Sequence, residues 1–199
     1  MNHPLHCRCG KLHGYVTPAR SSRRAVCYCR DCRAYARHLG RADVLDAHGG
    51  TEVVAMHPRQ IHFDNATTLA CLSMRRGGLL RWYAACCNTP IANTPRDPRV
   101  AYAGVVHACL SPGPPPIDAS FGNTVVVVNA KSALGEVKES KLASIGAVVV
   151  LGSAILRARL TGSWRNNPFF RGSAPVRERL VLTESAREAA YRDPPQAPA

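Results

Sequence analysis

Three cysteines of this chain lie within six residues, in the stretch CYCRDC. Side chains two apart in an extended strand point to the same face, so Cys27 and Cys29 converge, and Cys29 and Cys32 have the spacing of a zinc knuckle. Thiolates this close repel one another, and a zinc ion removes that repulsion because it binds them deprotonated. Three protein ligands leave a fourth tetrahedral position for water or substrate, as in catalytic zinc sites. We therefore expect a functional zinc site at this cysteine trio. The alternative is a closed structural site whose fourth ligand is His38 or His107.

A second set of four cysteines is split between two distant parts of the chain. Cys7 and Cys9 have the same two-residue spacing, and Cys86 and Cys87 follow the apolar stretch LLRWYAA. Together these thiols could complete one structural zinc site that joins the N-terminal strand to a later one. Neighbouring side chains on a strand point in opposite directions, so this second site is the weaker prediction. We expect one or two zinc ions in all.

The composition favours metal binding over disulfide bonds. The chain has 199 residues, nine of them cysteine, and the N-terminal stretch MNHPLHCRCG lacks the apolar run of a secretory signal. We therefore expect a cytoplasmic protein whose thiols stay reduced, and clustered cysteines there indicate metal binding or catalysis. Cys71 and Cys109 stand alone in apolar stretches, where we expect ordinary core residues.

The elements expected in the first half of the chain are short strands and one helix. Stretches rich in apolar and β-branched residues, bounded by glycine or proline, predict the strands. A helix over 30–39, which includes the last cysteine of the trio, is expected to end at Gly40. The strands are expected at 51–58, 59–64, 78–87 and 99–110.

A proline-rich stretch, SPGPPPID at 111–118, predicts a stiff connector, because proline fits neither a helix interior nor a central strand. It divides the chain into a zinc-binding domain, 1–110, and a C-terminal extension, 111–199. In the extension we expect a strand at 124–130, an apolar helix at 141–160, a short helix near Ser185, with Ser185 and Glu188 as a capping box, and a loose tail at 193–199. The predicted fold class is mainly β with a helical C-terminal extension.

The segment 141–160 is apolar nearly all round, with fifteen uncharged residues between Lys141 and Arg157. A membrane-spanning helix needs about 17–25 residues of this kind, so we expect a buried helix instead. The alternative is membrane surface contact by 141–160, with Arg157, Arg159 and Arg165 near anionic headgroups.

The cysteine pattern resembles that of the glutathione-dependent formaldehyde-activating enzyme (GFA) family, which includes centromere protein V. The family pattern is C-x-C-G, C-x-C-x-x-C and C-x-x-C-G-T, and this chain has CRCG, CYCRDC and CCNTPIANT in the same order. The resemblance covers roughly residues 3–110 and implies a zinc-binding fold of small twisted antiparallel sheets. Two positions depart from the pattern: Ala84 stands where the family has a cysteine, and Asn88 where glycine is usual.

The resemblance also implies a division of labour between two zinc sites. Cys7, Cys9 and Cys87 match structural ligands, with Cys86 or a histidine as a candidate fourth. The trio matches a more weakly held functional zinc, near which glutathione binds. The implied activity is that of a carbon–sulfur lyase that condenses glutathione with formaldehyde to S-hydroxymethylglutathione. The residues alone leave a non-catalytic zinc protein as the alternative.

The net charge of +13 favours anionic partners. Arg30, Arg33 and Arg37 flank the trio, and arginine suits paired hydrogen bonds to the carboxylates of a thiol such as glutathione. Arg33 and Arg37 are four residues apart and share a helix face, which could also be merely solvated. The alternative function is a zinc module that binds nucleic acid or another anionic partner through its basic surface, and a third is a metal store or thiol redox sensor.

Overall fold

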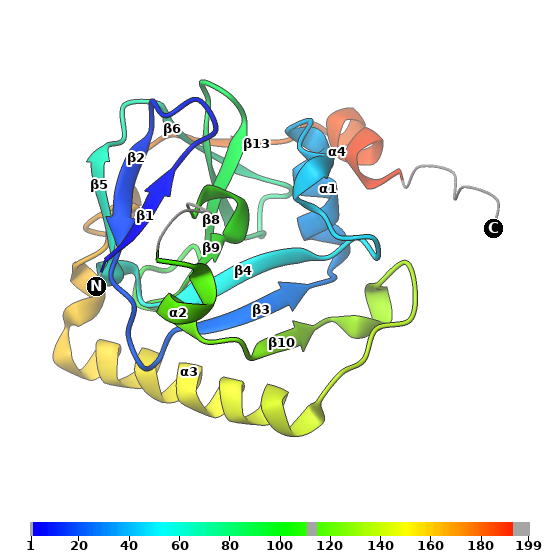
Figure 1. Ribbon diagram of the computed structural model, residues 1–199. Helices are drawn as coiled ribbons and strands as arrows, with labels where there is room; N and C mark the ends of the chain where they lie inside the picture. The colour runs from blue at the N-terminus through cyan, green and yellow to red at the C-terminus, as the bar shows by residue number, and fades with distance from the viewer. Residues whose placement is uncertain (1, 111–114, 193–199) are drawn as a thin grey trace.

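The computed structural model describes residues 2–110 and 115–192. The described chain forms a three-stranded sheet, an eight-stranded sheet and a short two-stranded ribbon, with helices on the outside (Figure 1). Most strand pairs are antiparallel, and the longest helix belongs to the second half of the chain. The expected fold class, β-rich with a helical C-terminal part, is confirmed. The connector residues 111–114 and the tail 193–199 lie outside the described residues.

The three-stranded sheet carries the first cysteine pair on the loop between its first two strands. Its order is β1 (His3–His6), β2 (His13–Val16) and β5 (Ile61–Asn65), all antiparallel. Gly14 lets β2 approach β5, because a Cβ atom there would lie 2.0 Å from the carbonyl oxygen of His62. The close pairing of these strands fixes the position of the loop at 7–12.

The eight-stranded sheet is completed by strands from both halves of the chain. Its order is β10-β3-β4-β9-β8-β7-β6-β13, in which the two edge strands, β10 and β13, pair in parallel with β3 and β6. Both edge strands come from residues after the connector, so the second half of the chain extends the sheet of the first half. The strands are β3 (Arg23–Cys27), β4 (Thr51–Met56), β6 (Leu69–Ser73), β7 (Leu80–Ala84), β8 (Thr89–Thr94), β9 (Ala103–Val106), β10 (Val125–Val128) and β13 (Arg179–Val181).

The main core is built around Trp82, which is fully buried on β7. The ring of Phe169 lies 4.9 Å from the indole ring, centroid to centroid, and Phe170 lies 6.4 Å away. The indole N–H donates a hydrogen bond of 2.9 Å to the hydroxyl of Thr94. Cys71 and Cys109 are buried in this core, as expected. A domain boundary at residue 110 stays a prediction, but the core itself uses aromatic residues from both sides of it.

Two short helices pack side by side next to the trio (Figure 1). Helix α1 (Arg30–His38) ends just before Gly40, whose φ of 65° is the left-handed conformation that glycine tolerates, so this predicted helix is confirmed. Helix α4 (Glu184–Tyr191) is capped by Thr183, whose hydroxyl accepts from the backbone N–H of Ala186. The predicted capping box at Ser185 is therefore wrong, since a better cap stands two residues earlier.

Helix α3 (Lys141–Thr161) lies along the outside of the sheet beside β10 and β3 (Figure 1). The prediction that this segment is buried is wrong, because only one side of the helix faces the sheet. Leu142 is 84% exposed and Leu160 is 79% exposed on the outer side. Within the described residues, no helix has the length and apolar character needed to cross a membrane. Contact with a membrane surface stays a prediction.

The remaining short elements connect the sheets and helices. They are α2 (Ile117–Phe121), the ribbon of β11 (Phe170–Arg171) and β12 (Ala174–Pro175), and five 3-10 turns, η1 (Ala42–Val44), η2 (Pro58–Gln60), η3 (His107–Cys109), η4 (Ala130–Ser132) and η5 (Ser163–Arg165).

Candidate metal centres

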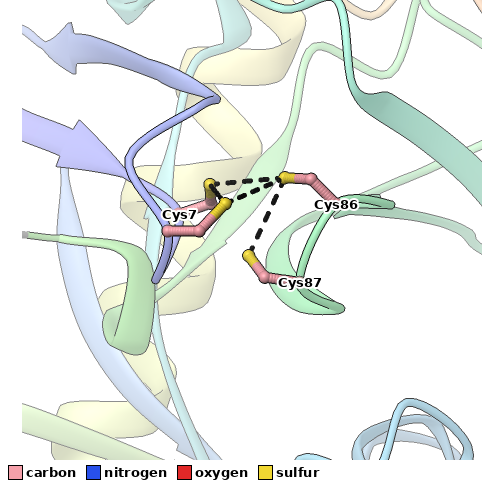
Figure 2. A group of neighbouring side chains, drawn as sticks. Cys7, Cys86 and Cys87 are labelled. Atoms are coloured by element: carbon pink, nitrogen blue, oxygen red, sulfur yellow. Dashed lines mark hydrogen bonds between the residues drawn. The ribbon is translucent and has the colours of Figure 1, made fainter.

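Four cysteine sulfurs meet between the loop that joins β1 to β2 and the turn that joins β7 to β8. The Sγ atom of Cys86 lies 3.3 Å from that of Cys9 and 3.7 Å from that of Cys7, and the Cys7 and Cys9 sulfurs are 3.6 Å apart. Figure 2 shows Cys7, Cys86 and Cys87 facing one another across this gap. A tetrahedral zinc site with Zn–S bonds of about 2.3 Å has sulfurs about 3.8 Å apart, so the four-cysteine cluster has the dimensions of such a site.

The backbone around the four-cysteine cluster explains why two adjacent cysteines both face inward. Strand β7 ends at Ala84, so Cys86 and Cys87 lie in a turn, where the alternation of a strand does not apply. Asn88 has a φ of 54°, a left-handed conformation in which asparagine substitutes for the usual glycine. On the other loop, the backbone N–H of Leu12 donates to the Sγ of Cys7, as in zinc knuckles. Cys86 and Cys87 therefore both lie close to Cys7 and Cys9 although they are adjacent in the sequence.

The metal-free thiols of the four-cysteine cluster titrate differently. Burial acts to raise the pKa of Cys87, but hydrogen bonds from the Thr89 hydroxyl and from the backbone N–H groups of Cys9 and Thr89 lower it to about 6. Burial raises the pKa of Cys86 to about 12, and its neighbouring thiols add to this effect. A cluster in which the pKa of Cys87 is lowered while the pKa values of Cys7 and Cys86 are raised gains from a cation that holds its thiols as thiolates.

The cysteine trio comes together at the end of β3 and the start of α1. Cys27 is the last residue of β3, Cys29 is the N-cap of α1, and Cys32 lies in its first turn. The three Sγ atoms lie within 4.8 Å of one another. The Sγ of Cys29 accepts a hydrogen bond of 3.3 Å from the backbone N–H of Cys32, and a helix N-terminus favours negative charge. The local sequence therefore produces the cluster that its spacing predicts.

The trio offers three ligands among the described residues. Neither histidine that we considered as a fourth ligand belongs to this group. The Nδ1 atom of His107 lies 3.2 Å from a carboxylate oxygen of Glu52, and burial lowers the pKa of His38 at the far end of α1. Cys27 and Cys29 are partly exposed, whereas Cys32 is buried. An ion held here by the trio would keep a coordination position for an external ligand.

A buried arginine that the sequence analysis did not identify lies beside the trio. Arg81, on β7, is only 2% exposed, and its guanidinium donates to the Sγ of Cys32 at 3.3 Å and to the amide oxygen of Asn93 at 3.0 Å. Its Cζ atom lies 5.3 Å from the centroid of the Tyr35 ring. No carboxylate of the described residues lies within ion-pair distance of Arg81. The negative partner of this buried cation is therefore the sulfur cluster.

Hydrogen bonds within the trio, helped by the charge of Arg81, favour ionisation of Cys32. Hydrogen bonds from Cys27 and Cys29, followed by the charge of Arg81, hold the pKa of Cys32 well below its usual value. Hydrogen bonds with Cys27 and Cys32 raise the pKa of Cys29. Cys32 is thus the thiol of the metal-free trio that ionises first, and binding a divalent cation would hold all three thiols as thiolates.

The three arginines predicted to bind substrate go to different places. Arg33 is buried and donates to the carbonyl of Ser132, while Arg37 donates to the carbonyl of Arg192 at the end of α4. Arg30 lines a pocket of about 450 Å³ between α1 and α4. The other residues of this arginine pocket are Asp31, Arg75, Arg187 and Tyr191. That Arg30, Arg33 and Arg37 bind substrate stays a prediction. Arg75 and Arg187 are further candidates because they line the same pocket as Arg30.

Two more residues near the trio were not identified from the sequence. The side-chain amide of Asn129 donates a hydrogen bond of 3.4 Å to the Sγ of Cys27. Burial, followed by the charges of Cys32 and Cys27, raises the pKa of Tyr102 to about 12, so its hydroxyl keeps its proton at neutral pH. Asn129 is 102 positions from its sulfur partner, and no spacing rule connects residues that far apart.

The buried cation makes a testable contribution to metal binding. We expect Arg81→Met to weaken zinc retention by the trio by about 10–100-fold, the usual effect of removing a residue that supports metal ligands. Arg81→Lys, which keeps the charge, should retain most of the affinity. The measurement is competition with a chromophoric chelator, with Arg99→Met at an exposed surface position as the matched control. Equal zinc affinity in Arg81→Met and the wild type would contradict the assigned role.

Comparisons with known proteins give a family and no function. No curated protein and no solved structure matches the chain. A family model described as "Family of unknown function (DUF6151)" matches residues 1–179, which include every cysteine of both clusters. The chain therefore belongs to the DUF6151 family.

Proposed function

We propose that this protein is a zinc-dependent carbon–sulfur lyase that resembles the GFA family and adds a thiol such as glutathione to formaldehyde or another small carbonyl compound. The observation that carries the proposal is the convergence of three cysteine sulfurs beside a buried arginine, with no fourth ligand from the described residues. The four-cysteine cluster would hold a second, structural zinc. The cysteine order and spacing of the GFA family support this assignment.

The charge balance of the trio suits binding of an anionic thiolate. A zinc ion held by Cys27, Cys29 and Cys32 would lower the pKa of a substrate thiol at its fourth position. Three thiolates outweigh the charge of a divalent cation by about one unit, and Arg81 supplies the compensating positive charge from the protein side. The amide of Asn129 takes part of the negative charge on Cys27 through its hydrogen bond.

The arginine pocket is where the carboxylates of glutathione would lie. Arg30 lines this pocket and belongs to the first turn of α1, between Cys29 and Cys32 in the sequence. Arg75 and Arg187 add two more guanidinium groups, and Asp31 is the only acidic residue that lines the pocket among those described. Guanidinium groups bind carboxylates through paired hydrogen bonds, which would orient the thiol of the bound tripeptide.

The proposed reaction forms one carbon–sulfur bond and is balanced without an oxidant. The thiol sulfur attacks the carbonyl carbon, the π electrons of the carbonyl move to its oxygen, and the proton released by the thiol ends on that oxygen. Tyr102 stays protonated near the trio and can donate a hydrogen bond to the oxygen as its negative charge develops. The reverse reaction breaks the same bond and regenerates thiol and carbonyl.

The test is a single change in the trio. We expect Cys29→Ser to lower the zinc content from about two ions to about one per chain with the fold retained, because the four-cysteine cluster is separate. Formation of S-hydroxymethylglutathione from ¹³C-formaldehyde and glutathione, followed by NMR, should fall by at least about 100-fold relative to the wild type. The control is Cys71→Ala, which removes a core thiol outside both clusters.

Two outcomes would contradict the proposal. One is unchanged metal content and unchanged rate in Cys29→Ser. The other is thermal stabilisation by a short DNA duplex but not by glutathione, with an effect that falls steeply as salt rises, which would favour the nucleic-acid-binding module.

A further inference from the structure

A second pocket lies between helix α3 and the strands that carry the trio. It encloses about 360 Å³ and is bounded by α3 on one side and by β10, β3 and β4 on the other. In Figure 1, α3 runs alongside β10 and β3. Helix residues Ala147 and Leu151 face sheet residues Ala25, Ala55 and Val126 across this space. The gap exists because small side chains face one another from both sides, so the helix does not seal against the sheet.

The lining of this α3 pocket suits a hydrocarbon chain. Most of its wall is formed by alanine, valine and leucine side chains, and its polar lining residues are Ser21, Arg23, Tyr102, Asn129 and Glu139. Binding sites for small molecules usually enclose about 300–1,000 Å³ and combine an apolar lining with a few polar groups that orient the ligand. The arginine pocket, by contrast, is lined mainly by charged residues, so the two pockets suit different ligands.

At one end of the α3 pocket, a lining residue contacts the trio. Asn129 lines the pocket and also donates its hydrogen bond to the Sγ of Cys27. Tyr102 lines the pocket as well, and the charges of the trio contribute to raising its pKa. Val128, another lining residue, is the β10 partner of Cys27 in the parallel pairing of β10 with β3. A molecule in the pocket with a reactive group at the Asn129 end would present that group to the sulfurs.

We propose that the α3 pocket binds the alkyl chain of an aliphatic aldehyde whose carbonyl group reaches the trio. This inference rests on the proposed function and names its carbonyl substrate: an aldehyde with an apolar chain rather than formaldehyde, which has no chain to occupy the pocket. The bond changes are those of the proposed reaction. The thiol sulfur bonds to the aldehyde carbon, and the thiol proton ends on the oxygen, giving a hemithioacetal.

The binding test uses 1-octanol, which has the chain but no carbonyl group to react. Isothermal titration should show affinity that rises about fourfold per methylene group from 1-butanol to 1-octanol, as expected for burial of an alkyl chain. Ala147→Phe places a ring in the pocket, and losing burial of about two methylene groups corresponds to binding about fifteenfold weaker. Val149→Phe makes a similar change on the outer side of α3, where the side chain is 64% exposed, and should leave octanol binding unchanged.

The reaction test compares octanal with formaldehyde, each with glutathione. We expect Ala147→Phe to lower kcat/KM for octanal by about tenfold or more while leaving the value for formaldehyde within about twofold, and Val149→Phe to change neither. Two results would overturn the inference even if formaldehyde is still consumed. One is an affinity that stays the same from 1-butanol to 1-octanol, and the other is equal octanol affinity in Ala147→Phe and Val149→Phe. Octanal turnover that is unchanged in Cys29→Ser would instead show that the proposed function has failed, and with it the placement of the carbonyl at the trio.

Discussion

Cys86→Ser is expected to cause a much larger loss of stability than Cys29→Ser, which makes the same chemical change in the other cluster. The four-cysteine cluster joins the loop between β1 and β2 to the turn between β7 and β8, 79 residues apart. Structural zinc sites of this kind contribute about 10–16 kcal/mol of apparent binding free energy, whereas a whole domain is stable by about 5–15 kcal/mol. We therefore expect Cys86→Ser to lose one zinc ion and to fold poorly at 37 °C.

The measurement combines metal analysis with thermal unfolding followed by circular dichroism. Cys29→Ser is the matched control, because it makes the same chemical change in the other cluster and should shift the midpoint far less. Treatment of the wild-type protein with a strong chelator should reproduce the unfolding of Cys86→Ser. A Cys86→Ser protein that keeps about two zinc ions and the wild-type midpoint would show that the cluster is not a structural site.

The two clusters differ in how far the sequence could predict them. The trio is local, and the spacing CYCRDC with a helix start directly after it contains nearly all the information that brings the sulfurs together. The four-cysteine cluster depends on where β7 ends. A strand that continued through Cys86 would separate the two adjacent thiols, and the strand ends two residues earlier, at Ala84. Positions of strand ends are the least reliable part of sequence-based prediction, because pairing with distant strands decides them.

Arg81 could have been identified from a signal already present in the sequence. It is the one charged residue in the apolar stretch LLRWYAA, and a charge inside a central strand requires a buried partner. That partner, Cys32, is 49 residues away and belongs to another element, so the identity of the pair depends on the order of the strands. The sequence thus shows that Arg81 is an unusual charge in an apolar strand, but it does not identify Cys32 as the partner.

Helix α3 shows the limit of composition as a guide to burial. A helix that is apolar on all sides but too short to span a membrane is usually buried. Here one side contacts the sheet, and the outer side exposes Leu142, Ile145, Leu156 and Leu160. The sequence does not indicate how many layers the fold has. In the structure, no further element of the described chain covers the outer side of this helix (Figure 1).

Phe169→Ala is expected to reduce the free energy of unfolding by about 3–5 kcal/mol, the usual effect of deleting a fully buried aromatic side chain. Phe169 is fully buried and lies against the ring of Trp82, at the centre of the core. Chemical denaturation followed by tryptophan fluorescence measures the loss. Leu180→Ala, at a position that is 58% exposed on edge strand β13, is the control and should change stability by less than about 1 kcal/mol.

The contact between Phe169 and Trp82 also predicts that a chain shortened to residues 1–110 does not fold. Residues 1–110 alone lack Phe169, Phe170 and both edge strands of the large sheet, so Trp82 would lose the rings that cover it. Trp82 is the only tryptophan in that fragment, and its fluorescence should report a solvent-exposed indole. A fragment that retained a buried Trp82 and cooperative unfolding would show that the second half of the chain is a dispensable extension. Failure of the fragment to fold would mean that the trio, although encoded in fewer than ten residues, is held in place by a core that needs both halves of the chain.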